Sequence, residues 1–554
     1  MFFRTKKSGP RTYLQIVENR WINGGVKQRV VATLGRLEEL QSSGQIEALI
    51  ASGARFTDAV LLSGAHREGK LPGASSRRIG PALIFERLWT ETGCREVLEH
   101  LLAERQYTFA VERAIFLTVL HRLFDPGSDR AAEKWRQDYR IAGTEGLQLH
   151  QLYRAMAWLG EPLPEEEQSG KTRAPRCMKD VVEEGLFAHR RDLFSSLDLV
   201  FFDTTSIYFE GAGGDTLGQR GKSKDHRPDL RQLVVGVILD GRGRPICCEL
   251  WPGNTSDVTS LIPIVDRLRQ RFTIGQICIV ADRGMISRDV VRQLEAAERG
   301  WLYILGARPR ADKEVRTQVL ADSGAFEVVH PKSTIRKDPS PLQVKEVKIG
   351  PRRYVVCFNE DQAKKDAADR EAIVASLRGQ LKQGAKALVG NKGYRKYLAA
   401  QRGALAVDEA KIAAETRYDG MWVLRTNTEL SSREVALKYK QLWMVEQLFR
   451  SMKSLLETRP IYHKRDETIR GHVFCSFLAL VLRKELQDRL VARGEVCEWD
   501  DIRHDLERLQ ETRVEHQGKT FFLRAETTGS CGKVFQAAGV ALPPTLRSAK
   551  EAHV

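Results

Sequence analysis

The middle of the chain alternates between short apolar runs, rich in β-branched and aromatic residues, and stretches whose apolar positions recur with helical periodicity. A turn signal at Asp240 and Gly241 lies between two of these runs and predicts a hairpin. The predicted order is three strands, helix, strand, helix, strand, at residues 199–202, 233–239, 245–250, 256 onward, 277–282, 287–299 and 301–305. This order is typical of an α/β domain, in which the first and fourth strands can be neighbours.

The N-terminal part has two different patterns. Strand-like runs at 12–21 and 26–34 flank the turn signal Asn-Gly-Gly at 23–25 and predict a β-hairpin. From residue 80 to residue 160 the periodicity is helical, and Ser128 is placed to cap a helix over 129–139. We therefore predict a compact helical domain after the hairpin region.

A long segment separates the fifth strand of the α/β domain from the helix that carries Glu446. It spans about 110 residues, too many for a loop in a compact domain. Its strand-like runs and one charged helical stretch lie at 326–330, 342–349, 353–358 and 361–383. The interpretation is an inserted, mostly β subdomain beside the α/β domain, which resumes at 418–427.

These patterns divide the chain into six segments. They are an N-terminal β-containing region at 1–75, a helical domain at 76–190, the first part of the α/β core at 195–310, the β-rich insertion at 311–417, the second part of the core at 418–490 and a C-terminal region at 491–554.

The formal net charge is +16, which favours a polyanionic partner such as nucleic acid, although a protein that is simply basic is the alternative. The nine cysteines contain no C-x-x-C pair, which argues against a zinc site and favours reduced thiols in the cytoplasm. No apolar run approaches the ~18 residues of a membrane span, and the N-terminus lacks the apolar segment of a secretory signal. No membrane partner is therefore expected.

Three carboxylates stand at positions where an acid is costly. Asp203 and Asp282 each close an apolar run that predicts a buried strand, and Glu446 lies on the inward face of an otherwise apolar helix. Oxygen ligands suit Mg²⁺ or Mn²⁺, and two such ions about 3.5–4 Å apart can drive phosphodiester chemistry. We predict that the three acids converge on two Mg²⁺ ions, with Mn²⁺ as a substitute.

Other candidate residues have competing explanations. A helix N-cap explains Asp257, and a turn explains Asp240. Four tryptophans beside the core are candidates to stack on an extruded base, but core packing is favoured for each of them: Trp251, Trp301, Trp422 and Trp443. A basic loop after the first strand is predicted to follow a phosphodiester backbone, with a solvated loop as the alternative, through Lys222, Lys224, Arg227 and Arg231.

Five motifs carry a family resemblance. They are Asp-Thr-Thr-Ser at 203–206, Lys-Asp-His-Arg-Pro-Asp-Leu-Arg-Gln at 224–232, Pro-Gly-Asn-Thr-Ser-Asp at 252–257, Val-Ala-Asp-Arg-Gly at 280–284 and the helix at 439–453. Together they resemble bacterial insertion-sequence transposases of the DDE class, closest to the insertion-sequence-four-like superfamily with a β-rich insertion. The resemblance implies a ribonuclease-H-like α/β core interrupted by that insertion, with an N-terminal β-hairpin region and a helical domain.

In that family the third acid belongs to a signature of Tyr, two residues, Arg, three residues, Glu, six residues, Lys. Tyr439, Glu446 and Lys453 match these spacings, but Leu442 stands at the arginine position. On one continuous helix these positions share a face with Arg450, which we predict to supply the missing charge. The resemblance implies that Tyr439, Lys453 and Arg450 contact DNA.

The resemblance implies an enzyme that binds the terminal inverted repeats of an insertion sequence, cleaves the ends and joins them to target DNA by two-metal chemistry. It implies double-stranded DNA as the partner, a homodimer in the DNA complex, and a bacterial cytoplasmic location, on the nucleoid when DNA is bound. The helical domain at 76–190 is a candidate for DNA-end binding, with a structural role as the favoured alternative. Two alternatives are a ribonuclease-H-like nuclease or resolvase without strand transfer, and an inactive DNA-binding regulator derived from a transposase. The presence of all three acids favours an enzyme.

Overall fold

The computed structural model describes residues 1–22, 25–54, 75–168, 174–190, 199–272, 277–296, 300–332, 338–382, 396–401, 404–516 and 519–548. The chain forms two compact units. The first consists of Met1–Pro81, Asp138–Arg140 and Cys497–Val554, and the second of Ala82–Gln137 and Ile141–Val496. Within the described ranges, no helix combines the length and the apolar character needed to cross a bilayer.

The N-terminal sheet of the first unit has three antiparallel strands, β1 (Phe2–Ser8), β2 (Arg11–Ile22) and β3 (Gly25–Arg36). Two short helices follow them, α1 (Leu37–Ser42) and α2 (Gln45–Ala54). The predicted hairpin is confirmed as β2 and β3, although residues 23 and 24 of its turn lie outside the described residues. The prediction missed β1, because most side chains of this strand are exposed and carry no apolar alternation.

The first unit also contains a four-stranded sheet in the order β18-β17-β16-β4. Its strands and the two helices beside them in the sequence are β4 (Ser75–Arg78), α18 (Trp499–Arg508), β16 (Gln510–His516), β17 (Lys519–Arg524), α19 (Cys531–Ala538) and β18 (Leu546–Ser548). The hydroxyls of Ser76 on β4 and Thr512 on β16 hydrogen bond at 2.8 Å although 436 residues separate them. Segments that are far apart in the sequence therefore share one sheet.

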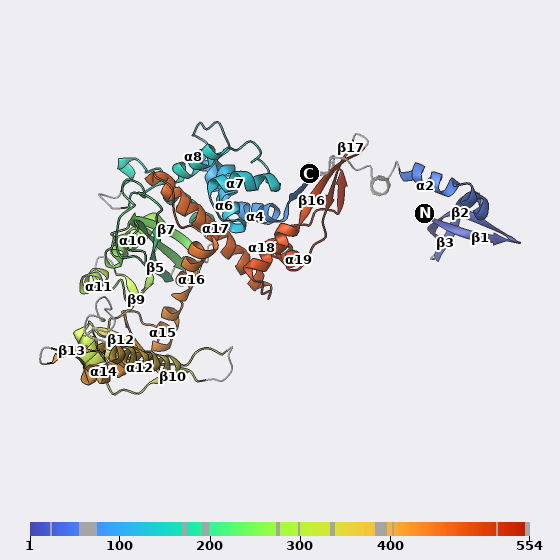
Figure 1. Cartoon of the computed structure of the whole chain (residues 1–554). Helices are drawn as coiled ribbons and strands as arrows, with labels where there is room; N and C mark the ends of the chain where they lie inside the picture. Colours follow the sequence, from blue (N-terminus) through green and yellow to red (C-terminus); the bar gives the residue numbers. More distant parts are fainter. Residues whose placement is uncertain are drawn as a thin grey trace. The chain divides into compact units, whose positions relative to one another are not determined.

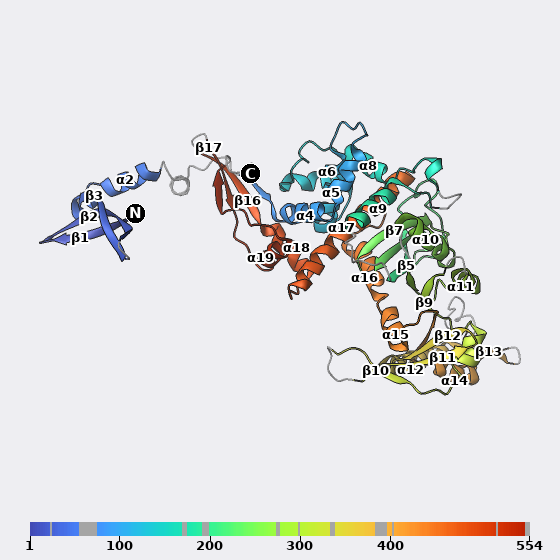
Figure 2. The same ribbon diagram turned by 180° about the vertical axis from the view of Figure 1, so that it is seen from behind.

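The second unit is built on a nine-stranded mixed sheet in the order β10-β11-β12-β15-β9-β8-β5-β6-β7. Figures 1 and 2 both label β5, β7, β9, β10 and β12 of this sheet, seen from opposite sides. The strands are β5 (Leu199–Tyr208), β6 (Gln232–Asp240), β7 (Pro245–Pro252), β8 (Cys278–Ala281), β9 (Leu302–Gly306), β10 (Glu327–His330), β11 (Leu342–Ile349), β12 (Arg352–Phe358) and β15 (Met421–Thr426). β5, β8 and β9 are parallel, and the other pairings are antiparallel. The predicted α/β class and the neighbouring first and fourth strands are confirmed.

One face of the central strands is covered by α10 (Asp257–Phe272) and α11 (Arg288–Glu295), whose apolar residues share a core cluster with the sheet (Figure 1). Val200 and Phe202 of β5 belong to this cluster. Because successive side chains of a strand point to opposite faces, Asp203 leaves β5 on the other face. That face is contacted by α16 (Trp443–Arg450).

The helices before the sheet include α4 (Gly80–Glu91), α5 (Cys94–Leu102), α6 (Val111–Phe124), α7 (Asp129–Trp135), α8 (Leu149–Leu159) and α9 (Met178–Arg190). The Ser128 side chain caps α7, accepting the Ala131 N–H at 3.2 Å, as predicted. The long helix α17 (Asp466–Ala492) packs against α6 and α8 and is buried over most of its length. A helix from the C-terminal half of the chain thus completes this helical bundle.

Between β9 and β15 the structure has β10, β11 and β12, then α12 (Glu360–Lys382), the two-stranded sheet of β13 (Leu398–Gln401) and β14 (Ala404–Val407), and α14 (Glu409–Glu415). Val374 and Leu377 of α12 form a small core with Tyr397. The β12 strand pairs with β15, and β15 pairs with β9. The strands of this segment therefore extend the central sheet.

Candidate active site

Three carboxylates from separate elements line one cavity of about 250 Å³. Asp203 lies on β5, Asp282 directly follows β8, and Glu446 lies on α16. Phe202 and Ala281 are register partners on the parallel strands β5 and β8, so the next residue on each chain is an aspartate at the same level. The structure thus brings together the three acids that the sequence singled out.

The Asp203 carboxylate is partly buried, and this burial raises its pKa to about 6. The nearby carboxylates of Asp282 and Asp257 raise this pKa as well. Two neighbours act in the opposite direction: the Thr204 backbone N–H donates to Asp203 Oδ1 at 2.7 Å, and the Lys224 ammonium lies 3.8 Å from the same oxygen. The site therefore has an excess of negative charge that a cation would relieve.

The donors around the cavity fit a hard divalent cation. All three acids offer carboxylate oxygens, the ligands that Mg²⁺ and Mn²⁺ prefer. The Lys224 ammonium lies beside Asp203 at the edge of the same site, so these carboxylates already have one cation as a neighbour. Asp203, Asp282 and Glu446 are the residues that would hold the metal.

Tyr439 is tied to one of these acids. It lies on α15 (Ser432–Lys440), and its hydroxyl donates to Asp282 Oδ1 at 2.9 Å. Burial and the adjacent Asp282 carboxylate raise the pKa of the Tyr439 phenol well above its usual range, so it stays a donor. Gly306, at the end of β9, leaves room for this ring, because a Cβ there would lie 2.4 Å from the Tyr439 oxygen. Tyr439 therefore orients Asp282 in the structure.

The helix that carries the signature is not continuous, which corrects the expectation that positions 439 to 453 share one face. α15 ends at Lys440, α16 begins at Trp443, and the buried side chain of Leu442 packs at the junction. Of the described residues that line the cavity, the cation from this region is Lys440, whereas Arg450 is exposed at the far end of α16. Burial lowers the pKa of the Lys440 ammonium.

Lys453 follows α16 in a single π-helical turn (Ser451–Leu455). Its ammonium donates to Asp225 Oδ1 at 2.8 Å, and Arg459 lies 3.2 Å from the other oxygen of the same carboxylate. The lysine is largely buried, and burial lowers its pKa. In the structure Lys453 thus anchors the basic loop through Asp225.

The cations of the basic loop differ in their surroundings. Lys222 is exposed, and Arg227 is exposed but paired with Asp229 at 2.8 Å. Arg231 donates to two backbone carbonyls, those of Ala212 at 3.1 Å and Gly218 at 3.4 Å, and so holds the glycine-rich loop. The loop therefore mixes outward-facing and structural cations.

Two residues beside the site have contacts that the sequence analysis did not predict. The Lys224 ammonium turns inward and donates to the Thr204 carbonyl at 2.6 Å. Asp257, expected to act as a helix cap, instead accepts the Thr204 hydroxyl at 2.6 Å and lies 3.5 Å from the Lys224 ammonium. The motif that contains Asp257 was noticed, but a local pattern cannot tell a capping carboxylate from one that faces a distant strand.

The four tryptophans separate into two pairs. Trp251 and Trp301 are buried in the core of the sheet, as their packing explanation requires. Trp422 and Trp443 line the acidic cavity, and Trp443 is 56% exposed.

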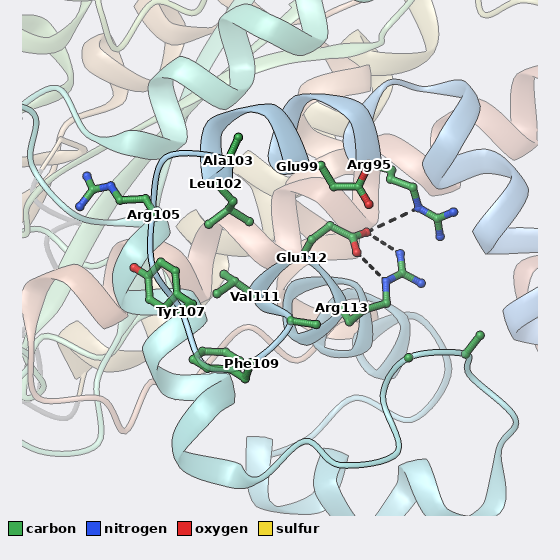
Figure 3. A pocket seen from close by; sticks show the side chains of 13 residues that line it. Arg95, Glu99, Leu102, Ala103, Arg105, Tyr107, Phe109, Val111, Glu112 and Arg113 are labelled. Carbon is green, nitrogen blue, oxygen red and sulfur yellow. Dashed lines mark hydrogen bonds and ion pairs between the residues drawn. The ribbon is translucent and has the colours of Figure 1, made fainter.

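A larger cavity, of about 560 Å³, lies among the helices and is drawn in Figure 3. Its buried acid Glu112 is bonded to Arg113 and lies 3.9 Å from Arg95, and it also accepts the Trp89 indole N–H at 2.6 Å. These ionic groups satisfy one another. The cavity therefore offers less to a charged ligand than the smaller acidic one.

A cluster of Asp129, His463 and His472 also brings potential metal ligands together. The His472 Nε2 faces the Thr458 carbonyl at 3.1 Å, and its Nδ1 lies 2.9 Å from an Arg122 nitrogen. A guanidinium only donates, so it uses the lone pair of that Nδ1. The Nδ1 lone pair of His472 is thus already used, and His463 Nε2 lies 3.5 Å from Asp129, so we assign no metal to the cluster.

Replacing Tyr439 by phenylalanine is expected to lower the affinity of the protein for Mn²⁺ about tenfold or more, because the partner that orients Asp282 is lost. Titration of the full-length protein, read by the electron paramagnetic resonance signal of free Mn²⁺, measures this change. Gly306→Ala should act in the same direction by displacing the tyrosine. An affinity unchanged in both variants would show that Asp282 needs no such support.

Two protein-family models match parts of this chain. Residues 3–65 match the model described as "IS1634 family transposase, N-terminal domain", and residues 195–482 match the model described as "Transposase DDE domain". A search of the curated proteins found no match. One similar solved structure is the cryo-EM structure of the piggyBac transposase synaptic complex with hairpin DNA, at 12% identity and a TM-score of 0.37, covering 77% of this chain and 79% of that chain. A TM-score this low carries no argument about this chain.

Proposed function

This chain belongs to the family of DDE transposases, and from that premise we propose that it binds the terminal inverted repeats of an insertion sequence, cleaves the ends and joins them to target DNA. The observation that carries the proposal is the single cavity lined by Asp203, Asp282 and Glu446. The N-terminal match names the IS1634 family. A wider grouping with the insertion-sequence-four-like superfamily remains our inference from the motifs.

In this proposal the three acids bind the catalytic metal. When bound, Mg²⁺ or Mn²⁺ supplies activation of the attacking water or 3′-hydroxyl and compensates charge on the departing oxygen. The chain's own residues do the rest: Tyr439 holds Asp282 in place. Lys440 lines the cavity and meets a phosphate oxygen, a role that we give it because Leu442 stands where the family signature has arginine. Trp443, exposed beside the acids, packs against the DNA strand that enters.

We infer further that the DNA duplex runs past the exposed cations of the basic loop and of α16. Processing two ends of one element in a coordinated way favours a homodimer in the DNA complex, which mass measurement of the complex tests. A DNA substrate of this kind places the protein in the bacterial cytoplasm, on the nucleoid.

The test is a strand-transfer assay with labelled element-end duplex, supercoiled target DNA and Mg²⁺. The proposal requires both cleaved ends and ends covalently joined to the target. Cleavage without joining would identify a nuclease or resolvase, and binding without cleavage would identify an inactive regulator.

Neutralising Lys222 and Arg450 together, by substitution with glutamine, should reduce the salt dependence of DNA binding. Each phosphate contact contributes about −0.9 to the slope of log affinity against log salt, so the slope should become shallower by up to ~2. Both side chains are exposed, so the fold should be unaffected. Titrations of end duplex at several salt concentrations measure the slope, and an unaltered slope would remove these two residues from the DNA path.

A further inference from the structure

The Lys224 ammonium is held at the edge of the acidic cavity by oxygens of two elements. It donates to the Thr204 carbonyl at 2.6 Å and lies 2.9 Å from the Thr204 hydroxyl. It also lies 3.5 Å from Asp257 Oδ2 and 3.8 Å from Asp203 Oδ1. The backbone of this lysine is fixed as well, since its N–H donates to the Ser206 hydroxyl at 2.8 Å. The ammonium therefore occupies a built position.

Asp257 contacts both Thr204 and the Lys224 ammonium from a different element, the helix α10. It is the first residue of α10, and its Oδ1 accepts the Thr204 hydroxyl at 2.6 Å. Its Oδ2 lies 3.7 Å from the point where a Cβ on Gly284 would stand, and Asp282 Oδ2 lies 3.9 Å from the same point. Asp257 is thus a fourth carboxylate of the site, between the Lys224 ammonium and the Asp282 side of the cavity.

Asp203 and Asp257 compete for the positive charge of the Lys224 ammonium. The ammonium is shared between Asp203, which belongs to the three acids of the family, and Asp257, which does not. An ammonium fully paired with Asp203 would oppose a divalent cation at that carboxylate, both by occupying an oxygen and by repulsion. The ammonium lies within ion-pair distance of both carboxylates, 3.5 Å from Asp257 Oδ2 and 3.8 Å from Asp203 Oδ1.

We propose that Asp257 and Lys224 form a built-in counter-ion pair that sets the affinity of the catalytic acids for divalent metal. Lys224 neutralises the acids while no metal is bound, and Asp257 retains the ammonium when metal takes over Asp203. Both are positioning residues. The proposal rests on the proposed function insofar as Asp203, Asp282 and Glu446 bind metal.

The pair predicts opposite effects of two charge-removing substitutions. Lys224→Met removes the competitor and should tighten Mn²⁺ binding about tenfold, whereas Asp257→Asn leaves the ammonium to Asp203 and should weaken it about tenfold. The Mn²⁺ affinity of the double variant should be close to that of the wild type, because the two substitutions change this affinity in opposite directions. A merely structural role for either residue would weaken binding in both single variants.

The experiment is titration of the full-length protein with Mn²⁺ in the absence of DNA, read by the electron paramagnetic resonance of the free ion. Lys365→Met, which removes a charge from the exposed surface of α12, is the matched control and should leave the affinity unchanged. Lys224→Gln keeps a polar donor for the Thr204 carbonyl and replaces Lys224→Met if that variant does not fold, as judged by circular dichroism.

Weaker binding in both single variants, or no change in either, would overturn the counter-ion pair. Loss of all binding in Asp257→Asn, with no tightening in the Lys224 variants, would make Asp257 a metal ligand and also overturn it. Asp203→Ala separates this result from a failure of the proposed function: if wild type and Asp203→Ala bind Mn²⁺ equally, the metal site itself is refuted.

Discussion

Replacing Glu446 by glutamine is expected to abolish Mg²⁺-dependent cleavage of element ends, by roughly a thousandfold or more, or about 4 kcal/mol of transition-state stabilisation. The amide keeps the size of the side chain but removes the charge that a divalent ion needs. Asp203→Asn and Asp282→Asn should have the same effect, because all three carboxylates line one cavity. DNA binding should persist in each variant. Cleavage of labelled end duplex and a gel-shift titration of the same duplex measure the two activities separately.

The matched control is Asp240→Asn, which removes a carboxylate from the same sheet at the turn between β6 and β7. There Asp240 Oδ1 accepts the backbone N–H groups of Arg242 and Arg244, each at 2.8 Å, so its role is local. This variant should cleave like the wild type. Retained Mg²⁺-dependent cleavage by Glu446→Gln would transfer the role of third acid to another carboxylate, such as Asp257.

The central strands, Asp203 and Asp282 could be predicted from a local signal, and Glu446 could be predicted from its place on an otherwise apolar helix and from the family signature. A carboxylate that ends a run of apolar, β-branched residues is visible in the sequence, and it occurs at Asp203 and at Asp282. The parallel pairing of β5 and β8 then brings the two carboxylates to one level. The order of elements allows that pairing without proving it, and the resemblance to a family with a ribonuclease-H-like core favoured it.

The surroundings of the acids could not be predicted, because they depend on contacts between distant residues. Lys224 looks like any cation of a basic loop until the loop folds back onto Thr204 of β5. Asp257 looks like a helix cap, and only the strand across from it shows which hydrogen bond its carboxylate accepts. The sequence pattern predicts which helix or strand carries a residue, but tertiary packing sets the direction of its side chain.

The expected single helix from Tyr439 to Lys453 shows a different limit. Every position in that segment is compatible with a helix, so helical periodicity alone predicts one continuous element. In the structure α15 ends at Lys440 and α16 begins at Trp443. The Tyr439 hydroxyl donates to Asp282 from the first of these helices, and Glu446 lies on the second.

Replacing Arg271 by methionine is expected to destabilise the second unit by about 3–5 kcal/mol, because it strips a buried charge network of its central cation. The Arg271 side chain, at the C-terminal end of α10, is 4% exposed. It lies 2.6 Å from Glu183, 2.7 Å from Glu184 and 3.2 Å from Glu249, which come from α9 and β7. Methionine has a similar volume but cannot pair with these carboxylates. Urea unfolding of the full chain, followed at the transition that unfolds the sheet, measures the loss.

The sign of the pH dependence gives a second check on Arg271→Met. Burial already raises the pKa of the Glu183 carboxyl, and loss of the guanidinium raises it further. The folded variant then holds a proton that the unfolded chain releases, so its free energy of unfolding falls as the pH rises above the ordinary range of a glutamate. The deficit relative to wild type should therefore be larger at pH 8 than at pH 5.5. Arg269→Met, two residues earlier on the exposed side of α10, should change stability by no more than about 0.5 kcal/mol at either pH. Equal losses in the two variants would show that the network stabilises the fold no more than a surface charge does.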